Sequence, residues 1–382
     1  MFFTKPGSSF SVKCRMLQNE LLHLIALSMV PNIGDVHTKT LLQHFTATEN
    51  IFKARKTELE KIPGIGSVRA SAIRNFRNFD RAEKEIKFLE KYKINALGMN
   101  DENYPKRLVH CYDAPPLLYF RGNGQLNCSR ILSIVGTREP TEYGRDWLKN
   151  LIQDLVPQGP VIISGLAYGI DTMAHKNALK NSLPTIGVLA HGLDRIYPSA
   201  NKSLAREMVE QGGLLTDFMS GTQPDAQNFP RRNRIVAGIA DAIIVVETGI
   251  KGGSMITADI ANSYNKDVFA LPGRVNDNKS EGCNKLIKEN KAQLVTDAED
   301  IIALLNWENI PVREKINQRL LFPDLSPEEK NILDLISKEE SVFVDKIYQL
   351  SGLKTSDTAA AILKLELLNL IRTLPGKRYQ LI

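Results

Sequence analysis

The chain of 382 residues is long enough for two or three domains, and its apolar share of 43% and charged share of 24% are those of an ordinary soluble protein. The longest apolar stretch near the N-terminus, residues 21–30, is too short to span a bilayer and is followed by no small-residue cleavage site, so we expect a cytoplasmic protein without membrane insertion. The four cysteines are far apart and form no CxxC pair, which argues against a zinc site or a disulfide framework.

The net charge of +6 is concentrated at one end of the chain. Residues 1–100 hold sixteen Lys plus Arg against nine Asp plus Glu, a balance of +7, so the remainder sums to −1. This distribution is typical of a module that faces a polyanion, attached to a near-neutral body. A solvated lysine-rich face is the alternative interpretation.

The first residues carry no helical period. We therefore expect residues 1–16 to be disordered, and Met16 is an alternative start because the amphipathic pattern begins at Leu17.

Residues 17–95 are predicted to form a helical domain of the helix-hairpin-helix or SAM-like type. Its turn at residues 62–66 fits the pattern hydrophobic-Pro-Gly-hydrophobic-Gly, whose glycines let a DNA phosphate approach the N–H groups of a helix start. Gly64, Gly66 and Arg69 are the predicted secondary DNA contacts. A similar turn at residues 30–34 has Asn32 in place of the first glycine. The alternative is a helical bundle that only packs on the next domain.

From residue 96 to residue 306 short apolar runs alternate with helical patterns, which indicates an α/β domain with a Rossmann-like, mostly parallel sheet. The predicted strands are Ile131–Val135, Val161–Ile163, Thr185–Leu189, Leu214–Thr216, Ile243–Val246 and Val268–Leu271.

Glycine-bearing loops follow four of these strands. Because the carboxyl ends of parallel strands share one edge, these loops should form one crevice rich in backbone donors. In the segment from Asn228 to Ala258, three arginines surround a helix start, and a glycine-rich loop precedes a second helix that Ser254 opens. Arginines beside a helix N-terminus favour phosphate as the ligand.

The usual nucleotide and catalytic motifs are absent. The sequence has no GxGxxG after the first strand, no GxxxxGK[ST], no HExxH and no paired-carboxylate or Cys–His arrangement, so we predict no cofactor, no metal and no catalytic residue. The acidic residues nearest the edge, Asp171, Asp194 and Glu247, are interpreted as helix-terminal or loop-orienting groups. His175 and His191 are interpreted as structural.

The C-terminal part begins after a polar linker at residues 307–324. Residues 325–382 have a winged-helix layout, with predicted helices at 327–337, 342–350 and 355–369 and a hairpin around Pro375-Gly376-Lys377. The third helix has only Lys354 and Lys364 as nearby basic groups, whereas base readout uses arginine, asparagine or glutamine. A protein-contact or accessory role is therefore favoured over duplex reading.

Seven ordered motifs give the chain a family resemblance. They are Val135-Gly136-Thr137-Arg138, Ser164–Asp171, Ala174-His175, Gly192-Leu193-Asp194 with Tyr197-Pro198, Phe229–Arg234, Gly252-Gly253-Ser254 with Ile256-Thr257-Ala258, and Pro272-Gly273. In these the chain resembles the bacterial DNA-processing protein A family (DprA/Smf). It departs from the family at Tyr168, where arginine is usual.

The resemblance implies a binding protein rather than an enzyme. Members bind and protect single-stranded DNA in natural transformation, dimerise, and load a RecA-type recombinase. Carried onto this sequence, the DNA contacts would be Arg138 first and Lys202 second, with Ser164, Gly165, Gly169, Arg231, Asn233, Arg234, Gly252, Gly253 and Ser254. In the alternative interpretation, Arg231 and Arg234 tie their loop to carboxylates such as Glu247.

The sequence is also compatible with two other functions. One is a nucleotide-processing enzyme similar to the LOG-type phosphoribohydrolases, although here Gly252-Gly253 is not followed by that group's glutamate. The other is a structural adaptor whose end domains make protein contacts only.

Overall fold

The structure, a computed structural model, describes residues 18–307, 325–337, 342–368, 370–374 and 378–381. The expectations for residues 1–16, for the start at Met16, for the linker from residue 308 onward and for the tip of the last hairpin lie outside the described residues. The chain divides into two compact units, residues 1–308 and 309–382.

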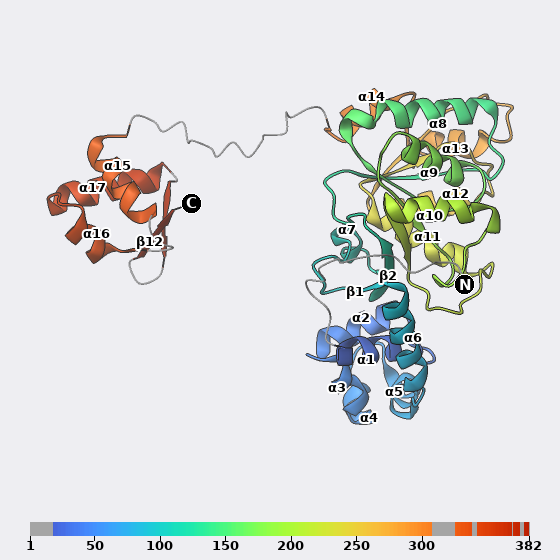
Figure 1. The fold of residues 1–382 in the computed structure, drawn as a ribbon, viewed down its shortest axis with the longest axis horizontal. Coiled ribbons are helices and arrows are strands. Elements are labelled where there is room, and N and C mark those ends of the chain that lie inside the picture. Colours follow the sequence, from blue (N-terminus) through green and yellow to red (C-terminus); the bar gives the residue numbers. More distant parts are fainter. Residues whose placement is uncertain (1–17, 308–324, 338–341, 369, 375–377, 382) are drawn as a thin grey trace. The chain divides into compact units, whose positions relative to one another are not determined.

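The first unit is built on a large mixed sheet (Figure 1). Within the described residues nine strands pair in the order β1-β2-β6-β5-β4-β3-β7-β8-β9. In this sheet order, all neighbouring strands between β6 and β9 pair in parallel. At the other edge, β2 pairs with β6 and β1 pairs with β2, both antiparallel. The mostly parallel Rossmann-like sheet is confirmed. The strands are β1 Asn95–Gly98, β2 Leu117–Gly122, β3 Ile131–Val135, β4 Val161–Ser164, β5 Thr185–Val188, β6 Gly212–Thr216, β7 Ala242–Val245, β8 Asp267–Ala270 and β9 Gln293–Leu294.

The central strands are apolar because helices cover both of their faces. All five residues of β3 are buried, as are all four of β7. On one face the core contains residues of α8 (Glu142–Asp154), α9 (Ile170–Lys180) and α14 (Ala298–Leu304). On the other it contains residues of α7 (Lys106–Val109), α11 (Asn228–Ile239), α12 (Gly253–Ser263) and α13 (Glu281–Lys288).

The six predicted strands are present with ends shifted by at most two residues. The other three strands, β1, β2 and β9, are not among those six. The short edge strands β1 and β9 were missed because β1 is half exposed and both residues of β9 are exposed. A short edge strand lacks the continuous apolar run that identifies a central one.

The helical region at the N-terminus packs onto the same sheet. Its helices are α1 Gln18–Ser28, α2 Asp35–His44, α3 Thr48–Lys53, α4 Lys56–Leu59, α5 Gly66–Asn75 and α6 Phe79–Tyr92. They enclose a small core of their own. In addition, α1 and α6 share a core with β2, β6 and α10 (Lys202–Glu210), so this region and the sheet form one compact unit.

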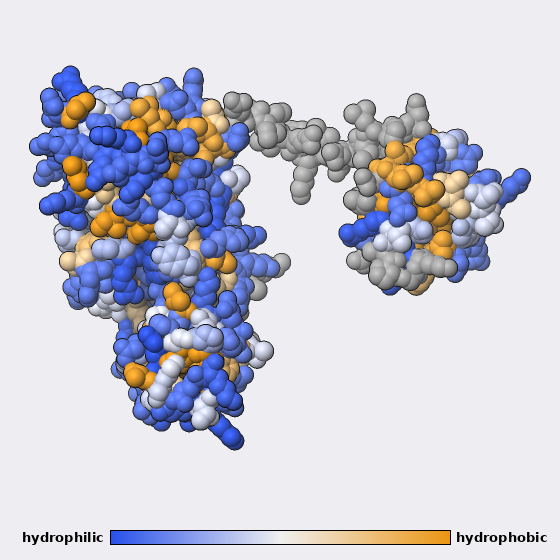
Figure 2. Space-filling view, turned by 180° about the vertical axis from the view of Figure 1, so that it is seen from behind, coloured by the Kyte–Doolittle hydropathy of each residue, from blue (hydrophilic) through white to orange (hydrophobic). Residues whose placement is uncertain are grey.

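The second unit has the predicted winged-helix layout. It contains α15 Pro327–Ser337, β10 Val342–Phe343, α16 Val344–Leu350, α17 Thr355–Leu367, β11 Ile371–Leu374 and β12 Arg378–Leu381. Its described strands pair in the order β10-β12-β11 around a separate core. Apolar surface is visible on this unit in Figure 2, and α17 exposes Leu363 and Leu367. Lys364 is ion-paired with Glu329 at 2.8 Å. Across both units, none of the described helices combines the length and the hydropathy needed to span a membrane.

Candidate functional site

The strand order creates a crevice between β3 and β7. Successive strands are added outward from β3 to β6, and the chain then returns to place β7 on the other side of β3. The strand order therefore reverses between β3 and β7. Ligands of open α/β sheets bind at such a point, outside the carboxyl ends of the strands. A cavity of about 400 Å³ lies here, between the loop after β3, the loop after β7 and the start of α11. We call it the main crevice. Its lining includes Arg138, Asn233, Gly252, Gly253 and Ser254.

Arg138 is the exposed cation of the main crevice. Among the described residues its side chain has no hydrogen-bond or ion-pair partner. Its backbone is fixed by Gly169, whose φ of +75° and lack of a side chain let the two loops touch: a Cβ there would lie 2.3 Å from the carbonyl oxygen of Thr137. The N–H of Ile170 donates to that same oxygen at 3.1 Å. Gly169 therefore positions Arg138, and it does not itself line the crevice.

Arg232 forms the floor of the crevice. It is 5% exposed, and its guanidinium donates to the carbonyl oxygens of Gly165 and Val188 at the ends of β4 and β5. A Cβ on Gly165 would lie 2.5 Å from that guanidinium, so the glycine makes room for the arginine. Burial lowers the pKa of Arg232, an effect that Asp171 opposes. An arginine remains charged at neutral pH, so the floor carries a guanidinium charge, with the Asp171 carboxyl group also in the lining.

Sequence reasoning assigned no contact to Arg232. The helical period contained a signal, because residues 232, 235, 236 and 239 fall on one face of α11, and that face is buried. An arginine on the apolar face of a helix that covers a sheet is positioned to reach the strand ends.

Arg234 is used inside the protein. Its guanidinium pairs with Asp217 at 2.6 Å and with Asp35 of α2 at 2.9 Å, and it donates to the carbonyl oxygen of Asp113. Burial alone would lower the pKa of Arg234, but the two carboxylates raise it overall. Arg234 lies outside the crevice walls formed by the described residues. Its bracing partners are thus Asp217 and Asp35, not Glu247.

The neighbouring Arg231 is exposed, and its guanidinium lies 5.3 Å from the centre of the Phe218 ring. Glu247 has a separate task. It is 1% exposed and accepts hydrogen bonds from the N–H of Thr141, at 2.9 Å, and from the Thr141 hydroxyl at the start of α8. This carboxylate therefore orients a helix start, as the sequence interpretation held for the acidic residues at this edge.

The N-terminus of α12 supplies the backbone donors. Gly252 is its N-cap, and a Cβ there would lie 2.1 Å from the Thr248 hydroxyl oxygen. A Cβ on Gly253 would meet nothing within 4 Å, so this position opens onto the crevice. Helix starts favour anions through their free N–H groups and the helix dipole. Lys279, which the sequence did not single out, also lines the crevice and pairs with Glu139 at 3.3 Å.

Two predicted contacts lie elsewhere. The hydroxyl of Ser164 is buried and donates to the carbonyl oxygen of Ile134 at 2.6 Å. Lys202 is exposed at the start of α10 and is not part of either cavity wall among the described residues. Neither position is brought into the crevice.

A smaller cavity of about 80 Å³ adjoins the main crevice and shares Arg138, Ala167, Phe229 and Arg232 with it. It is lined by aromatic side chains: Tyr168 is 51% exposed and Tyr197 is 49% exposed. The ring centres of Tyr197 and Phe229 are 6.1 Å apart. We call these three residues the aromatic wall.

The two predicted structural histidines are both buried. The Nε2 of His191 accepts the N–H of Tyr197 at 3.2 Å, and burial lowers the pKa of His191. The Nδ1 of His175 lies 2.6 Å from the hydroxyl of Thr185, which itself donates to the Ile162 carbonyl oxygen at 2.9 Å. The proton is therefore on Nδ1 of His175, and burial lowers its pKa to about 3.

The two hairpin turns of the helical region are alike in backbone. Asn32 has φ of +63° and Gly64 has φ of +82°, so the asparagine adopts the left-handed conformation that the glycine provides. Arg69 donates to the carbonyl oxygens of Asn32 and Gly64, both at 3.0 Å. Its guanidinium thus ties the two turns together, while the space around Gly66 is open.

Comparisons with known proteins follow the same division of the chain. Residues 95–306 match the family model "DNA recombination-mediator protein A". Residues 322–377 match the "DprA winged helix domain" and residues 23–86 match the "Helix-hairpin-helix motif".

Individual relatives agree. Protein Smf of Synechocystis is 34% identical over 96% of this chain and 100% of its own length. DNA processing protein DprA of Streptococcus pneumoniae is 41% identical over 55% of this chain and 74% of its own. The crystal structure of the S. pneumoniae protein superposes with a TM-score of 0.64 at 33% identity, over 76% of this chain and 98% of that one. A Helicobacter pylori structure, whose subject is a single-stranded DNA binding mode, has a TM-score of 0.52 at 33% identity, over 56% and 97%.

Proposed function

This chain belongs to the DNA recombination-mediator protein A (DprA/Smf) family, and on that premise we propose that it binds single-stranded DNA in the main crevice. The binding is independent of base sequence and serves DNA recombination. The role is that of a binding protein, in which the crevice holds the DNA without cleaving it.

The observation that carries the proposal is the combination of Arg138, Arg232 and the start of α12 in one crevice. Within the described residues the Arg138 guanidinium has no partner, and a guanidinium can grip phosphate in two places. Arg232 supplies a fixed positive charge below it. Gly253 and Ser254 offer backbone N–H groups at a helix start. These donors suit a phosphodiester backbone.

The aromatic wall supports a preference for single strands. Unpaired bases stack on exposed rings at about 1–3 kcal/mol per base, irrespective of sequence, whereas bases in a duplex are already stacked on one another. Tyr168, at the position where the family usually has arginine, adds a ring instead of a charge. We assign the wall to bases and the main crevice to phosphates.

A gel-shift salt titration tests the proposal with oligo-dT and with a duplex of equal length. Affinity for oligo-dT should exceed that for the duplex and should fall linearly on a log–log plot against salt, because phosphate contacts release counterions. Equal affinity for both, or no binding, contradicts the proposal. Gly64, Gly66 and Arg69 form a proposed weaker contact in the helical region, whose loss should reduce the salt slope only slightly.

Family membership further supports a homodimer that loads a RecA-type recombinase onto the bound strand. Sedimentation at several concentrations measures the dimer. Recombinase filament formation on oligo-dT, with and without this protein, measures loading. A monomer at all concentrations, or no acceleration of filament formation, would remove the corresponding part of the proposal.

The competing nucleotide-hydrolase function needs a free carboxylate at the crevice. The lining contains two carboxylates among the described residues, Glu139 and Asp171, and neither follows Gly252-Gly253 in the loop, where the LOG-type enzymes carry their glutamate. Release of free base from nucleoside monophosphates tests this function. Turnover that disappears on substitution of Gly253 would establish it.

A further inference from the structure

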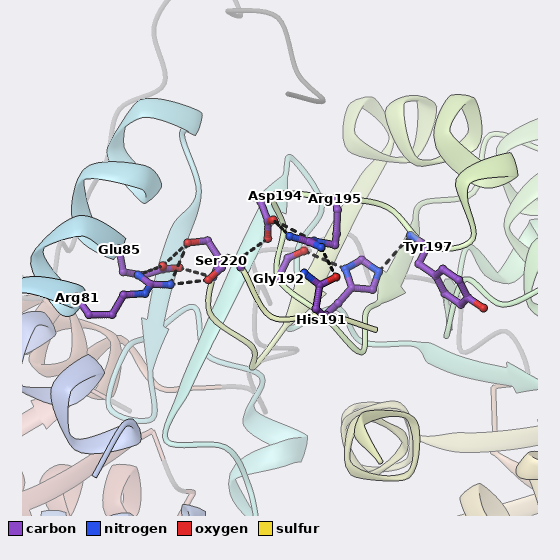
Figure 3. Close-up of polar contacts among 10 residues, drawn as sticks. Arg81, Glu85, His191, Gly192, Asp194, Arg195, Tyr197 and Ser220 are labelled. Carbon is purple, nitrogen blue, oxygen red and sulfur yellow. Dashed lines mark hydrogen bonds and ion pairs between the residues drawn. The ribbon is translucent and has the colours of Figure 1, made fainter. Parts of the chain in front are cut away.

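The helical region reaches the aromatic wall through a chain of polar contacts. We propose that Glu85 of α6 is a positioning residue for Tyr197, so that the helical region sets the shape of the smaller cavity. This inference rests on the proposed function only in treating the aromatic wall as a DNA surface. The contacts themselves are drawn in Figure 3.

The first step joins α6 to the loop after β6. Glu85 is 1% exposed, and its carboxylate accepts the N–H of Ser220 at 2.9 Å and the Ser220 hydroxyl. Arg81, one helical turn earlier, pairs with Glu85 at 2.8 Å and donates to the carbonyl oxygen of Ser220 (Figure 3). The backbone of Ser220 is therefore held on both its N–H and its carbonyl side by one helix.

The second step joins that loop to the segment after β5. The N–H of Gly221 donates to the carboxylate of Asp194 at 2.9 Å. A Cβ on Gly192 would lie 2.4 Å from the carbonyl oxygen of Met219 and 2.8 Å from the Cα of Ser220. The two segments thus lie close together along their backbones, and we expect a shift of Ser220 to be transmitted to residues 192–194.

The third step reaches the wall. His191 accepts the N–H of Tyr197 on Nε2, which leaves its Nδ1–H to donate to the carbonyl oxygen of Gly192 at 2.9 Å. The imidazole therefore spans the loop from Gly192 to Tyr197 (Figure 3). Tyr197 and Pro198 follow at the rim of the smaller cavity.

Glu85 anchors this chain of contacts because its carboxylate is buried. A buried carboxylate is tolerated only when its oxygens accept enough hydrogen bonds, and Glu85 accepts them from Ser220 and Arg81. A loop that moved away would leave this carboxylate without the Ser220 bonds, so Glu85 favours the observed position of Ser220. Removing the charge weakens the hold without altering any residue of the cavity lining.

Amide hydrogen exchange tests the linkage without DNA. In Glu85→Gln, exchange at residues 191–197 and 219–222 should be about tenfold faster while α12 and α13 remain at the wild-type rate. Glu83→Gln, an exposed neighbour on the same helix, is the matched control and should change neither. Unchanged exchange at residues 191–197 in a folded Glu85→Gln overturns the proposal.

A second pair of variants covers the case in which Glu85→Gln fails to fold. Ser220→Ala removes one hydroxyl contact to Glu85, and Ser220→Thr restores it. Faster exchange at residue 197 in the first and recovery in the second support the linkage; equal exchange in both refutes it.

Binding gives the functional readout. With oligo-dT carrying 2-aminopurine, Glu85→Gln should bind about threefold more weakly and lose part of the fluorescence quenching caused by stacking, at an unchanged salt slope. Weaker binding with full quenching would refute the positioning of Tyr197. If the wild type binds no DNA, the proposed function fails, and the exchange result still decides the linkage.

Discussion

The main crevice and the second hairpin turn of the helical region, at residues 62–66, use similar sequence elements. Each places glycines at a helix start beside an arginine: Arg138 with Gly253 in the crevice, Arg69 with Gly66 in the hairpin. In the crevice the guanidinium is exposed and unpaired among the described residues, whereas Arg69 donates to two carbonyl oxygens of the hairpins themselves. An exposed arginine whose donors are unused within the described residues is therefore the stronger indication of a ligand.

The same contrast separates the arginines of α11. Arg231 lies exposed on Phe218, Arg232 holds the strand ends at the crevice floor, and Arg234 joins α2 to the sheet through two carboxylates. These three arginines, which lie within four consecutive residues, thus serve three purposes. The following predictions test these assignments.

The largest effect is expected for Arg138→Glu. Replacing this exposed cation with an anion should weaken binding to oligo-dT by about a hundredfold, because a charge-assisted contact worth about 1.5–3 kcal/mol is lost and replaced by repulsion. Fluorescence anisotropy measures the affinity, and circular dichroism checks the fold. Lys149→Glu, on the exposed face of α8, is the control. Wild-type affinity in a folded Arg138→Glu would place the site elsewhere.

A smaller effect is expected for Gly253→Asp. The position has open space, so the side chain fits, and an acidic group at the start of α12 should leave thermal stability unchanged or slightly higher. The same carboxylate occupies the space of a phosphate and should weaken oligo-dT binding about tenfold. Gly253→Ala, which adds only a methyl group, should bind nearly as wild type. Equal losses in the two variants would point to shape rather than charge.

The second hairpin should contribute least to binding. Ser67 corresponds to Asp35 of the first hairpin, and Ser67→Asp gives the second turn the charge of the first. We expect oligo-dT affinity to fall about twofold, with the remaining affinity still abolished by Arg138→Glu. A tenfold loss would show that the hairpin, like the main crevice, is a main DNA contact.

Substitution of the buried His175 should leave DNA binding at neutral pH unchanged. Its folded pKa of about 3 lies below the ordinary value of 6.5, so between these values the unfolded chain binds a proton that the folded chain does not. Its contribution to stability is therefore complete above pH 6.5 and is lost as the pH falls toward 3. Urea unfolding at several pH values measures this, and His175→Gln should flatten the dependence. A steeper fall in that variant would contradict the assignment.

Much of the fold was predictable because long apolar runs and helical periods are local signals. The six central strands and the three helices of the winged-helix unit were found at nearly the predicted positions. The edge strands β1 and β9 were not, since partly exposed strands have no distinctive period. At the site, Arg138 and the loop Gly252–Ser254 were predicted to line one crevice, and both line it in the structure. Ser164 and Lys202 were also predicted, yet their side chains lie outside it.

The sequence by itself determined the parallel sheet, the glycine-bearing strand ends and the family, because these depend on residue type and order along the chain. Only the tertiary structure decided which donors remain available. Arg234 finds Asp35 some two hundred positions earlier, and Ser164 finds a carbonyl of the neighbouring strand. Such pairings depend on which segments the sheet brings together, and hydrogen-bond geometry at about 3 Å then settles each role.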